Sequence, residues 1–257
     1  MNFFAAAGSR LAFLLGRFFA EAPAVLRRAG FGEATAGNER GLTHIDRPRF
    51  PQATVPASPH SDAAEAIHHR QAMDLLAIGT LDILLVGDSL AQHWPLDGWG
   101  PWTAFSLGVG GDMTQHVLWR LDRIAWGTCR PRRILIVAGT NNLLFGEGHA
   151  DIEAGIMAIA ERLQAAQPAA ELFVLMPPPF GLDLKRADDE RRALRRRLAV
   201  RFGRRLIDAD AALLSDGPFA NPNYQPDLVH LTARGYEELV GWARAACDQS
   251  VHAQNGS

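Results

Sequence analysis

The ten residues from Leu81 to Leu90, LDILLVGDSL, constrain the fold more than any other stretch of this chain. The branched apolar residues from Ile83 to Val86 are typical of a strand that is buried on both faces of a parallel sheet. This strand ends at Gly87, and Ser89 follows on a turn. Because α/β sheets carry reactive groups just beyond the carboxyl ends of their strands, Ser89 is a candidate nucleophile. A Gly-Asp-Ser turn can also simply cap the next helix.

The composition bounds the class of protein. The chain has 257 residues, of which 47% are hydrophobic and 21% charged, which suffices for one sizeable core. The formal net charge of -2 gives no sign of a nucleic-acid-binding surface. An arginine-rich stretch over residues 183–202 also carries acidic residues, so an ion-paired, solvated helix face is expected there. Cys129 and Cys247 form neither a disulfide framework nor a C-x-x-C metal motif.

Strand and helix patterns alternate along the chain. Further buried strands are predicted at residues 104–107, 134–138, 172–176 and 206–207, and helices at 62–78, 114–126, 152–167, 183–202 and 232–247. In the first of these helices the residues available for the buried side are Ala66, Met73, Leu76 and Ala77. Helices between successive strands indicate a parallel sheet that is covered on both faces, and therefore a three-layer α/β/α sandwich.

Residues 1–30 form a separate predicted unit, an amphipathic helix. Apolar residues recur at three- and four-residue spacings on one face, and arginines occupy another; the two sets are Leu11, Leu14, Leu15, Phe18, Val25, Leu26 and Arg10, Arg17, Arg28. Three interpretations stay open: attachment to a membrane surface, a signal peptide cut near residues 22–24, and packing on the domain or a partner. The compartment is therefore open too, with a cytoplasmic or peripheral membrane location favoured over export.

The remaining boundaries follow from composition and periodicity. Residues 31–60 lack periodicity and contain several prolines, which predicts a linker or a loop draped over the domain. The globular domain is predicted to span residues 61–248, and residues 249–257 are expected to be a flexible tail.

Three further blocks of residues carry candidate chemistry. Gly108–Asp112 (GVGGD) and Gly139–Asn142 (GTNN) follow the second and third predicted strands, so they should reach the same sheet edge as Ser89. Asp227–His230 (DLVH) places a carboxylate three residues before an imidazole, so the two can touch on a turn. The G-x-S-x-G elbow is absent, because Ala91 stands at its second glycine. Each block alone has an ordinary explanation as a turn or helix cap; together they favour catalysis.

In this order, GDSL, GVGGD, GTNN and DLVH resemble the four blocks of the SGNH (GDSL) hydrolases. The longer runs GVGGDMTQHVLWRL and Val137–Asn142 are most similar to the catalytic subunits of intracellular platelet-activating-factor acetylhydrolase. The resemblance covers roughly residues 61–245 and implies a five-stranded parallel sheet of order 2-1-3-4-5. The family often has Asn two residues before the first glycine of the second block, where this chain has Ser106, a position expected to support the loop.

The resemblance also assigns roles to individual residues. It implies that Ser89 is the nucleophile, His230 the base that takes its proton, and Asp227 the group that orients the imidazole. The backbone N–H groups of Ser89 and Gly111 and the carboxamide of Asn141 would form the oxyanion hole. The residues expected to contact substrate are Leu90, Thr140 and Val229.

These roles predict a serine esterase that works through an acyl-enzyme without metal or cofactor. The resemblance to acetylhydrolases, together with the bulky Leu90 and Val229 beside the catalytic residues, implies a short acyl group, most simply acetyl, on a lipid or carbohydrate. One alternative is a polysaccharide O-acetyl esterase or acyltransferase, which differs in whether water or a sugar hydroxyl resolves the acyl-enzyme. An alternative of another class is a non-catalytic binding module on the same fold. The expected partner is a small ester; a homodimer and a membrane-surface contact through residues 1–30 are further options, and nucleic acid is not expected.

Overall fold

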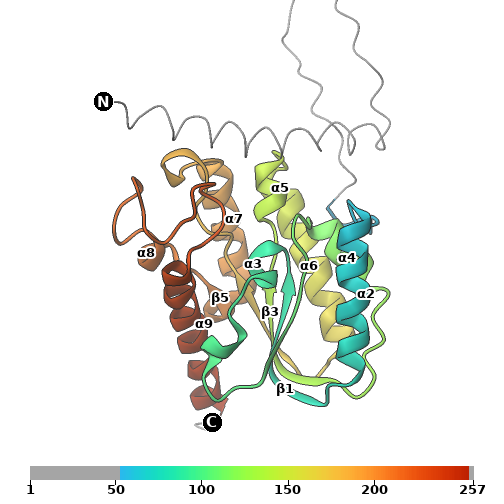
Figure 1. Ribbon diagram of the computed structural model, residues 1–257. Coiled ribbons are helices and arrows are strands. Elements are labelled where there is room, and N and C mark those ends of the chain that lie inside the picture. Colours follow the sequence, from blue (N-terminus) through green and yellow to red (C-terminus); the bar gives the residue numbers. More distant parts are fainter. Residues whose placement is uncertain (1–52, 255–257) are drawn as a thin grey trace, which may run out of the picture. The chain divides into compact units, whose positions relative to one another are not determined.

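The computed structural model describes residues 53–254, with side chains described up to residue 248. The predicted helix in residues 1–30 and most of the predicted linker lie outside the described residues. The five strands are β1 (Thr80–Gly87), β2 (Ala104–Gly108), β3 (Arg130–Val137), β4 (Glu171–Leu175) and β5 (Leu206–Ile207). All pairs are parallel and the order is β2-β1-β3-β4-β5 (Figure 1). The predicted parallel sheet and its strand order are confirmed.

Helices cover both faces of the sheet. One face packs against α2 (Asp62–Leu76), α4 (Thr114–Leu121), α6 (His149–Ala166) and α7 (Asp188–Phe202). The other packs against α3 (Ser89–Gln92), the 3-10 turn η1 (Leu96–Trp99), α8 (Asp210–Leu213) and α9 (Ala233–Gln254). Figure 1 shows α2, α4 and α6 on one side of the strands and α8 and α9 on the other. The predicted three-layer sandwich is thereby confirmed.

Alternation along each strand divides the core in two. In β1, Leu84 and Val86 face the layer with α4 and α6, whereas Ile83 and Leu85 face the layer with α9. All four side chains are fully buried. Successive side chains of a strand point to opposite faces, so a continuous apolar run is required wherever both faces are covered. Burial of each such side chain contributes about 1.5–3 kcal/mol. A run of four apolar residues therefore strongly favours a strand that is covered on both faces.

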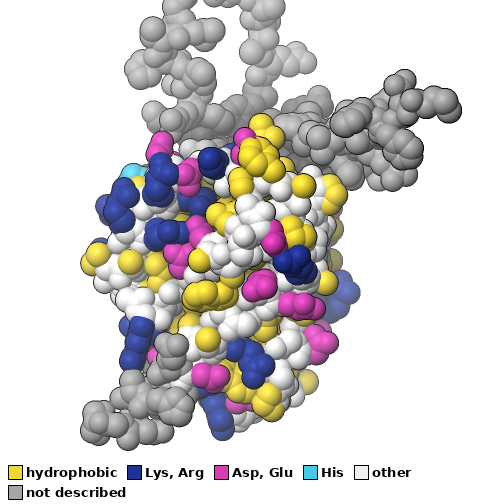
Figure 2. All heavy atoms as spheres, turned by 90° about the vertical axis from the view of Figure 1, so that its left-hand side faces the viewer, with side chains coloured by type: hydrophobic (Ala, Val, Ile, Leu, Met, Phe, Trp, Pro, Cys, Tyr) yellow, Lys and Arg dark blue, Asp and Glu magenta, His cyan; other side chains and the backbone are white. Residues whose placement is uncertain are grey.

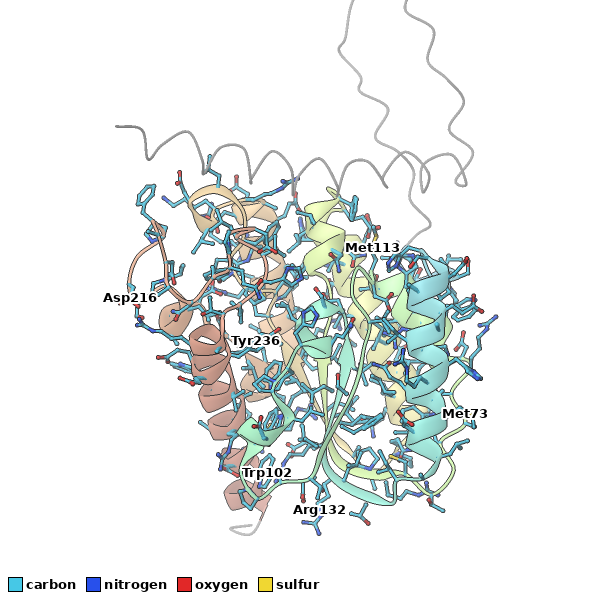
Figure 3. The ribbon with its side chains drawn as sticks, in the orientation of Figure 1. Met73, Trp102, Met113, Arg132, Asp216 and Tyr236 are labelled. Carbon is cyan, nitrogen blue, oxygen red and sulfur yellow. The ribbon has the colours of Figure 1, made fainter. Side chains whose placement is uncertain are left out.

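The buried side of α2 differs from the prediction. Ala64, His68 and Leu75 are buried, whereas Met73 is 55% and Leu76 41% exposed. Met73 lies on the outer side of the helix (Figure 3). The helix has few large apolar residues, so hydropathy defines its rotation weakly. The contact of the His68 ring with Trp119, at 5.9 Å between centroids, helps to orient it instead.

Several boundaries also differ from the predicted ones. A 3-10 turn, η2 (Leu182–Leu184), takes the place of the first turn of the helix predicted at 183–202, and α7 begins only at Asp188. The reason is local backbone conformation, because Asp183, Leu184 and Ala187 all have positive φ. The helix α9 continues to Gln254, into the segment 249–257 that is predicted to be a tail. None of the described helices is long and apolar enough to cross a membrane.

Candidate active site

Ser89 is the first residue of α3, and Asp88 alone separates it from the end of β1. The side chain of Asp88 caps this short helix, since its Oδ1 accepts the Leu90 N–H at 2.9 Å. Gly87 is required just before it, because a Cβ there would lie 1.7 Å from the carbonyl oxygen of Val137 on β3. Because α3 follows β1 in the chain, the serine lies at the carboxyl edge of the sheet, and Figure 1 shows α3 beside the strands.

A continuous chain of hydrogen bonds ends on Ser89. His230 Nε2 lies 2.9 Å from Ser89 Oγ, and His230 Nδ1 lies 2.6 Å from Asp227 Oδ2. The other oxygen of Asp227 accepts the backbone N–H groups of Val229 and His230, each at 2.9 Å. The carboxylate is thus held by its own turn while it holds the imidazole. The structure brings together the three side chains that the sequence predicted as a catalytic set.

The electrostatics of the three groups follow from these contacts. The hydrogen bond to Asp227 raises the pKa of His230, although burial opposes the shift. Burial would raise the pKa of Asp227, but the hydrogen bonds from His230 and Val229 bring it below its ordinary value. Beneath the serine, burial raises the pKa of Asp88 to about 7. The exposed ring of His93 lies edge-on to that of His230, with 5.7 Å between centroids.

Besides Ser89 itself, the predicted oxyanion donors are Gly111, on the loop after β2, and Asn141, in the first turn of α5 (Thr140–Leu144). A Cβ on Gly110 would come within 3.7 Å of Ser89 Cβ, so this loop flanks the serine. On its other side, Asn141 Nδ2 donates to the backbone oxygen of Asp112 at 2.8 Å. Gly111 lies between Gly110 and Asp112 in the chain, and its backbone N–H has no hydrogen-bond partner among residues 53–254. Asn141 has a second N–H on the same nitrogen, so Gly111 and Asn141 each retain one N–H that can donate to a substrate.

Hydroxyl and amide side chains fasten the second and third blocks. Ser106 Oγ accepts the Gly108 N–H at 3.0 Å and donates to the Ala91 carbonyl at 2.7 Å. The serine that replaces the family's Asn therefore joins the second block to α3. Asn142, the last residue of the third block, accepts the Thr114 N–H at 3.1 Å. The second and third blocks are thus fixed to each other near Met113, which lies close to α5 (Thr140–Leu144; Figure 3).

Arg120, which no predicted motif includes as a functional residue, is fully buried beneath the site. Its Nε donates to Asp112 Oδ2 at 2.6 Å, and its two terminal nitrogens donate to the carbonyls of Leu107 and Gly87. A buried guanidinium is tolerated because all three groups accept from it. Its spacing was the signal in the sequence, because Arg120 lies three residues after Val117 and one before Leu121, on the side of α4 that carries the apolar residues.

The sequence model of the GDSL-like Lipase/Acylhydrolase family matches residues 85–238. This chain belongs to that family. It is accordingly an ester hydrolase, and the resemblance inferred from its four blocks is confirmed. Two similar proteins are the platelet-activating factor acetylhydrolase IB subunits alpha1 of Bos taurus and alpha2 of Homo sapiens. The first is 32% identical over 181 residues, covering 66% of this chain and 76% of the relative. The second is 30% identical over 168 residues, covering 62% and 72%.

A solved structure supports the fold of this GDSL hydrolase. The GDSL-like lipase from Bacteroides thetaiotaomicron VPI-5482 superposes with a TM-score of 0.60 at 18% identity, covering 71% of this chain and 98% of that one. At this level of identity the likeness concerns the fold alone.

The residues expected to contact substrate differ in burial. Leu90 is 1% exposed and belongs to the core that includes Trp94. Thr140 is also buried, and Val229 is half-buried against the opposite core. The carbonyl of Leu90 accepts the hydroxyl of Tyr236, from α9, at 3.1 Å. A role of these three residues in substrate binding stays a prediction.

One cluster in the hydrolase has the composition of a metal site. Potential ligand atoms of His60, Asp112 and His116 lie within 4.8 Å of one another. However, His116 Nδ1 accepts the Met113 N–H at 3.0 Å, so the neutral ring carries its proton on Nε2. Burial lowers the pKa of His116 to about 4, which keeps the ring neutral. Neither nitrogen of His116 offers a lone pair to a cation, and the geometry does not favour a metal.

The arginines of α7 follow the expectation of ion pairing. Arg191 contacts Asp210 at 2.8 Å, and Arg201 contacts Glu153 at 3.2 Å. On the face of the molecule that carries α8 and α9, basic, acidic and hydrophobic side chains are intermixed (Figure 2). No large patch of one charge sign is visible on this face.

Proposed function

We propose that this GDSL hydrolase cleaves short-chain carboxylic esters, with a preference for acetyl esters, through an acyl-enzyme on Ser89. The observation that carries the proposal is the hydrogen-bonded chain from Asp227 through His230 to Ser89. A hydroxyl in this arrangement becomes nucleophilic at neutral pH, because the imidazole takes its proton as the new bond forms.

In acylation, Ser89 Oγ attacks the ester carbonyl carbon while His230 Nε2 accepts the hydroxyl proton. Asp227 stabilises the resulting imidazolium. The bond to the alcohol oxygen then breaks, and His230 gives its proton to the departing alcohol. In deacylation, a water molecule loses a proton to His230 and attacks the acyl carbon, and Ser89 recovers its proton as the carboxylic acid leaves.

Negative charge on the carbonyl oxygen needs donors that are already in place. Ser89 begins α3, so its N–H belongs to a first turn that lacks intrahelical acceptors. The N–H of Gly111 and the second N–H of Asn141 complete the proposed set. The hydrogen bond from Asn141 to Asp112 supports this role, because it holds α5 and the loop of the second block at one separation and spares reorganisation during the reaction.

Two observations support a short acyl group. Both relatives named above carry acetylhydrolase in their names. In addition, bulky apolar residues, Leu90 and Val229, adjoin the serine and the histidine in the chain. The alcohol portion is proposed only as far as its class, a lipid or a carbohydrate.

The test uses the full chain and p-nitrophenyl esters of increasing acyl length. Turnover should be highest for acetate, without any added sugar acceptor, and Ser89→Ala should lower it by about four to six orders of magnitude. A serine-directed phosphonate should form its adduct on Ser89, located by peptide mass spectrometry. Near-normal hydrolysis by the variant, or an adduct on another serine, would contradict the proposal.

A further inference from the structure

The residues that precede α2 are hydrogen-bonded to the first turn of α4, shortly after the second block. This entry segment, residues 53–60, lies outside the range that the family model matches. Thr114 Oγ1 donates to the Ala53 carbonyl at 3.0 Å, and the Ala57 N–H donates to the Gln115 carbonyl at 3.0 Å. Two prolines in the segment further restrict its backbone. The last residue of the segment, His60, is therefore held in a defined place.

His60 packs directly on Gly111, which is a proposed oxyanion donor. A Cβ on Gly111 would lie 2.9 Å from both Cε1 and Nε2 of the imidazole, so the ring rests against the backbone of that glycine. The inner nitrogen, Nδ1, points to Asp112 Oδ1 at 3.8 Å. Both of these atoms are buried, and neither has a hydrogen-bond partner within the described part of the chain.

Asp112 connects this histidine with the other proposed donor. Its backbone oxygen accepts from Asn141, and its Oδ2 accepts from the buried Arg120. Only Oδ1 is left, and it faces His60. Asp112 follows Gly111 in the chain and accepts a hydrogen bond from Asn141, so a contact at its Oδ1 can affect the positions of both proposed donors.

We infer that His60 is a positioning residue for the oxyanion hole, an inference that rests on the function proposed above. Its Nδ1–H donates to Asp112 Oδ1 in the substrate complex, and its ring backs Gly111. The distance from Nδ1 to Oδ1 has to shorten by roughly 1 Å to form this hydrogen bond, and hydrogen bonds in active sites commonly tighten when substrate binds. The effect should appear in the chemical step, because the donors matter most when the oxyanion forms.

The experiment compares four variants of the full chain on p-nitrophenyl acetate. His60→Ala should lower kcat roughly 10- to 100-fold with little change in KM, as expected for slight misplacement of catalytic groups. His60→Asn keeps an N–H near the position of Nδ1 and should restore most of kcat, whereas His60→Gln extends its amide toward the position of Nε2 and should not. The control is His69→Ala, which removes an exposed histidine of α2 and should behave like wild type.

A second readout is the rate at which a phosphonate labels Ser89, which should fall in parallel with kcat because the phosphonyl oxygen uses the same donors. Unchanged kcat in His60→Ala, a change in KM alone, or equal activity of the Asn and Gln variants would overturn the inference. If His60→Ala does not fold, the contrast between Asn and Gln decides. A wild-type chain that neither hydrolyses the ester nor reacts at Ser89 would contradict the proposed function itself.

Discussion

At the scale of single residues, the proposed role of Asn141 in the oxyanion hole can be probed by one substitution. One N–H donates to Asp112, and the other, which has no partner among residues 53–254, is the proposed donor to the substrate oxygen. Asn141→Ala should lower kcat roughly 10²- to 10³-fold, with a smaller effect on KM, because the bond strengthens as the oxyanion develops. Steady-state kinetics on a soluble acetyl ester measure both parameters.

The matched control is Gln164→Ala, which removes an exposed carboxamide of α6 far along the chain from every predicted block. It should leave both parameters unchanged. A change in KM alone for Asn141→Ala would make Asn141 a binding residue.

Also at the residue scale, we expect Asp227 to set the pH range of activity. Its hydrogen bond raises the pKa of His230 above the ordinary value of 6.5, and only the neutral imidazole can take the serine proton. Activity of the wild type should therefore fall as the pH drops through that raised pKa. Asp227→Asn removes the charge, so the acid limb should move to lower pH while the plateau rate falls roughly 10²- to 10⁴-fold.

Profiles of kcat/KM against pH measure this shift for the free enzyme. Asp97→Asn, which changes an exposed carboxylate in η1, is the control. An acid limb that stays in place or moves to higher pH in Asp227→Asn would show that the carboxylate does not act through His230.

At the scale of elements, the site depends on how closely β1 and β3 approach at their carboxyl ends. A Cβ on Gly87 would meet the Val137 carbonyl at 1.7 Å, a backbone atom that cannot turn aside. Gly87→Ala should therefore destabilise the fold by about 3 kcal/mol or more. Gly79→Ala adds the same methyl group where no atom lies within 4 Å and should have little effect. Urea unfolding of the two variants and the wild type gives the comparison, and equal midpoints would contradict it.

At the scale of the whole molecule, the predicted helix in residues 1–30 is proposed to attach the enzyme to anionic membrane surfaces. Because the entry segment contributes hydrogen bonds to the domain, the informative truncation begins at Ala53 rather than at Ser61. This shortened chain should keep esterase activity on a soluble ester and lose co-sedimentation with anionic vesicles. The full chain should lose co-sedimentation at high salt, since screening weakens the arginine contacts.

Two results would contradict membrane attachment. A mature protein whose N-terminal sequence starts just after Ala24 would indicate a signal peptide. A truncated protein that unfolds or aggregates would indicate that the apolar stripe packs on the domain or on a partner.

The sequence by itself determined the sheet and the residues that meet at its edge. The run from Ile83 to Val86 had to be buried on both faces, and parallel strands end at a common edge, so Ser89, Gly111 and Asn141 could be placed together from their positions after strands. His230 could be added because its own turn supplies the Asp227 contact, which is local in sequence.

Only the tertiary structure decided the features that depend on partners from distant elements. Arg120 can be buried because acceptors come to it from Asp112, Leu107 and Gly87, and no pattern in one helix reveals them. The rotation of α2 was mispredicted for the same reason, since a weakly amphipathic helix takes its orientation from contacts such as Trp119. His60 lies next to Gly111 because hydrogen bonds across more than fifty residues fix the entry segment. Such contacts form only when distant elements pack together, so the propensities of a local segment cannot predict them.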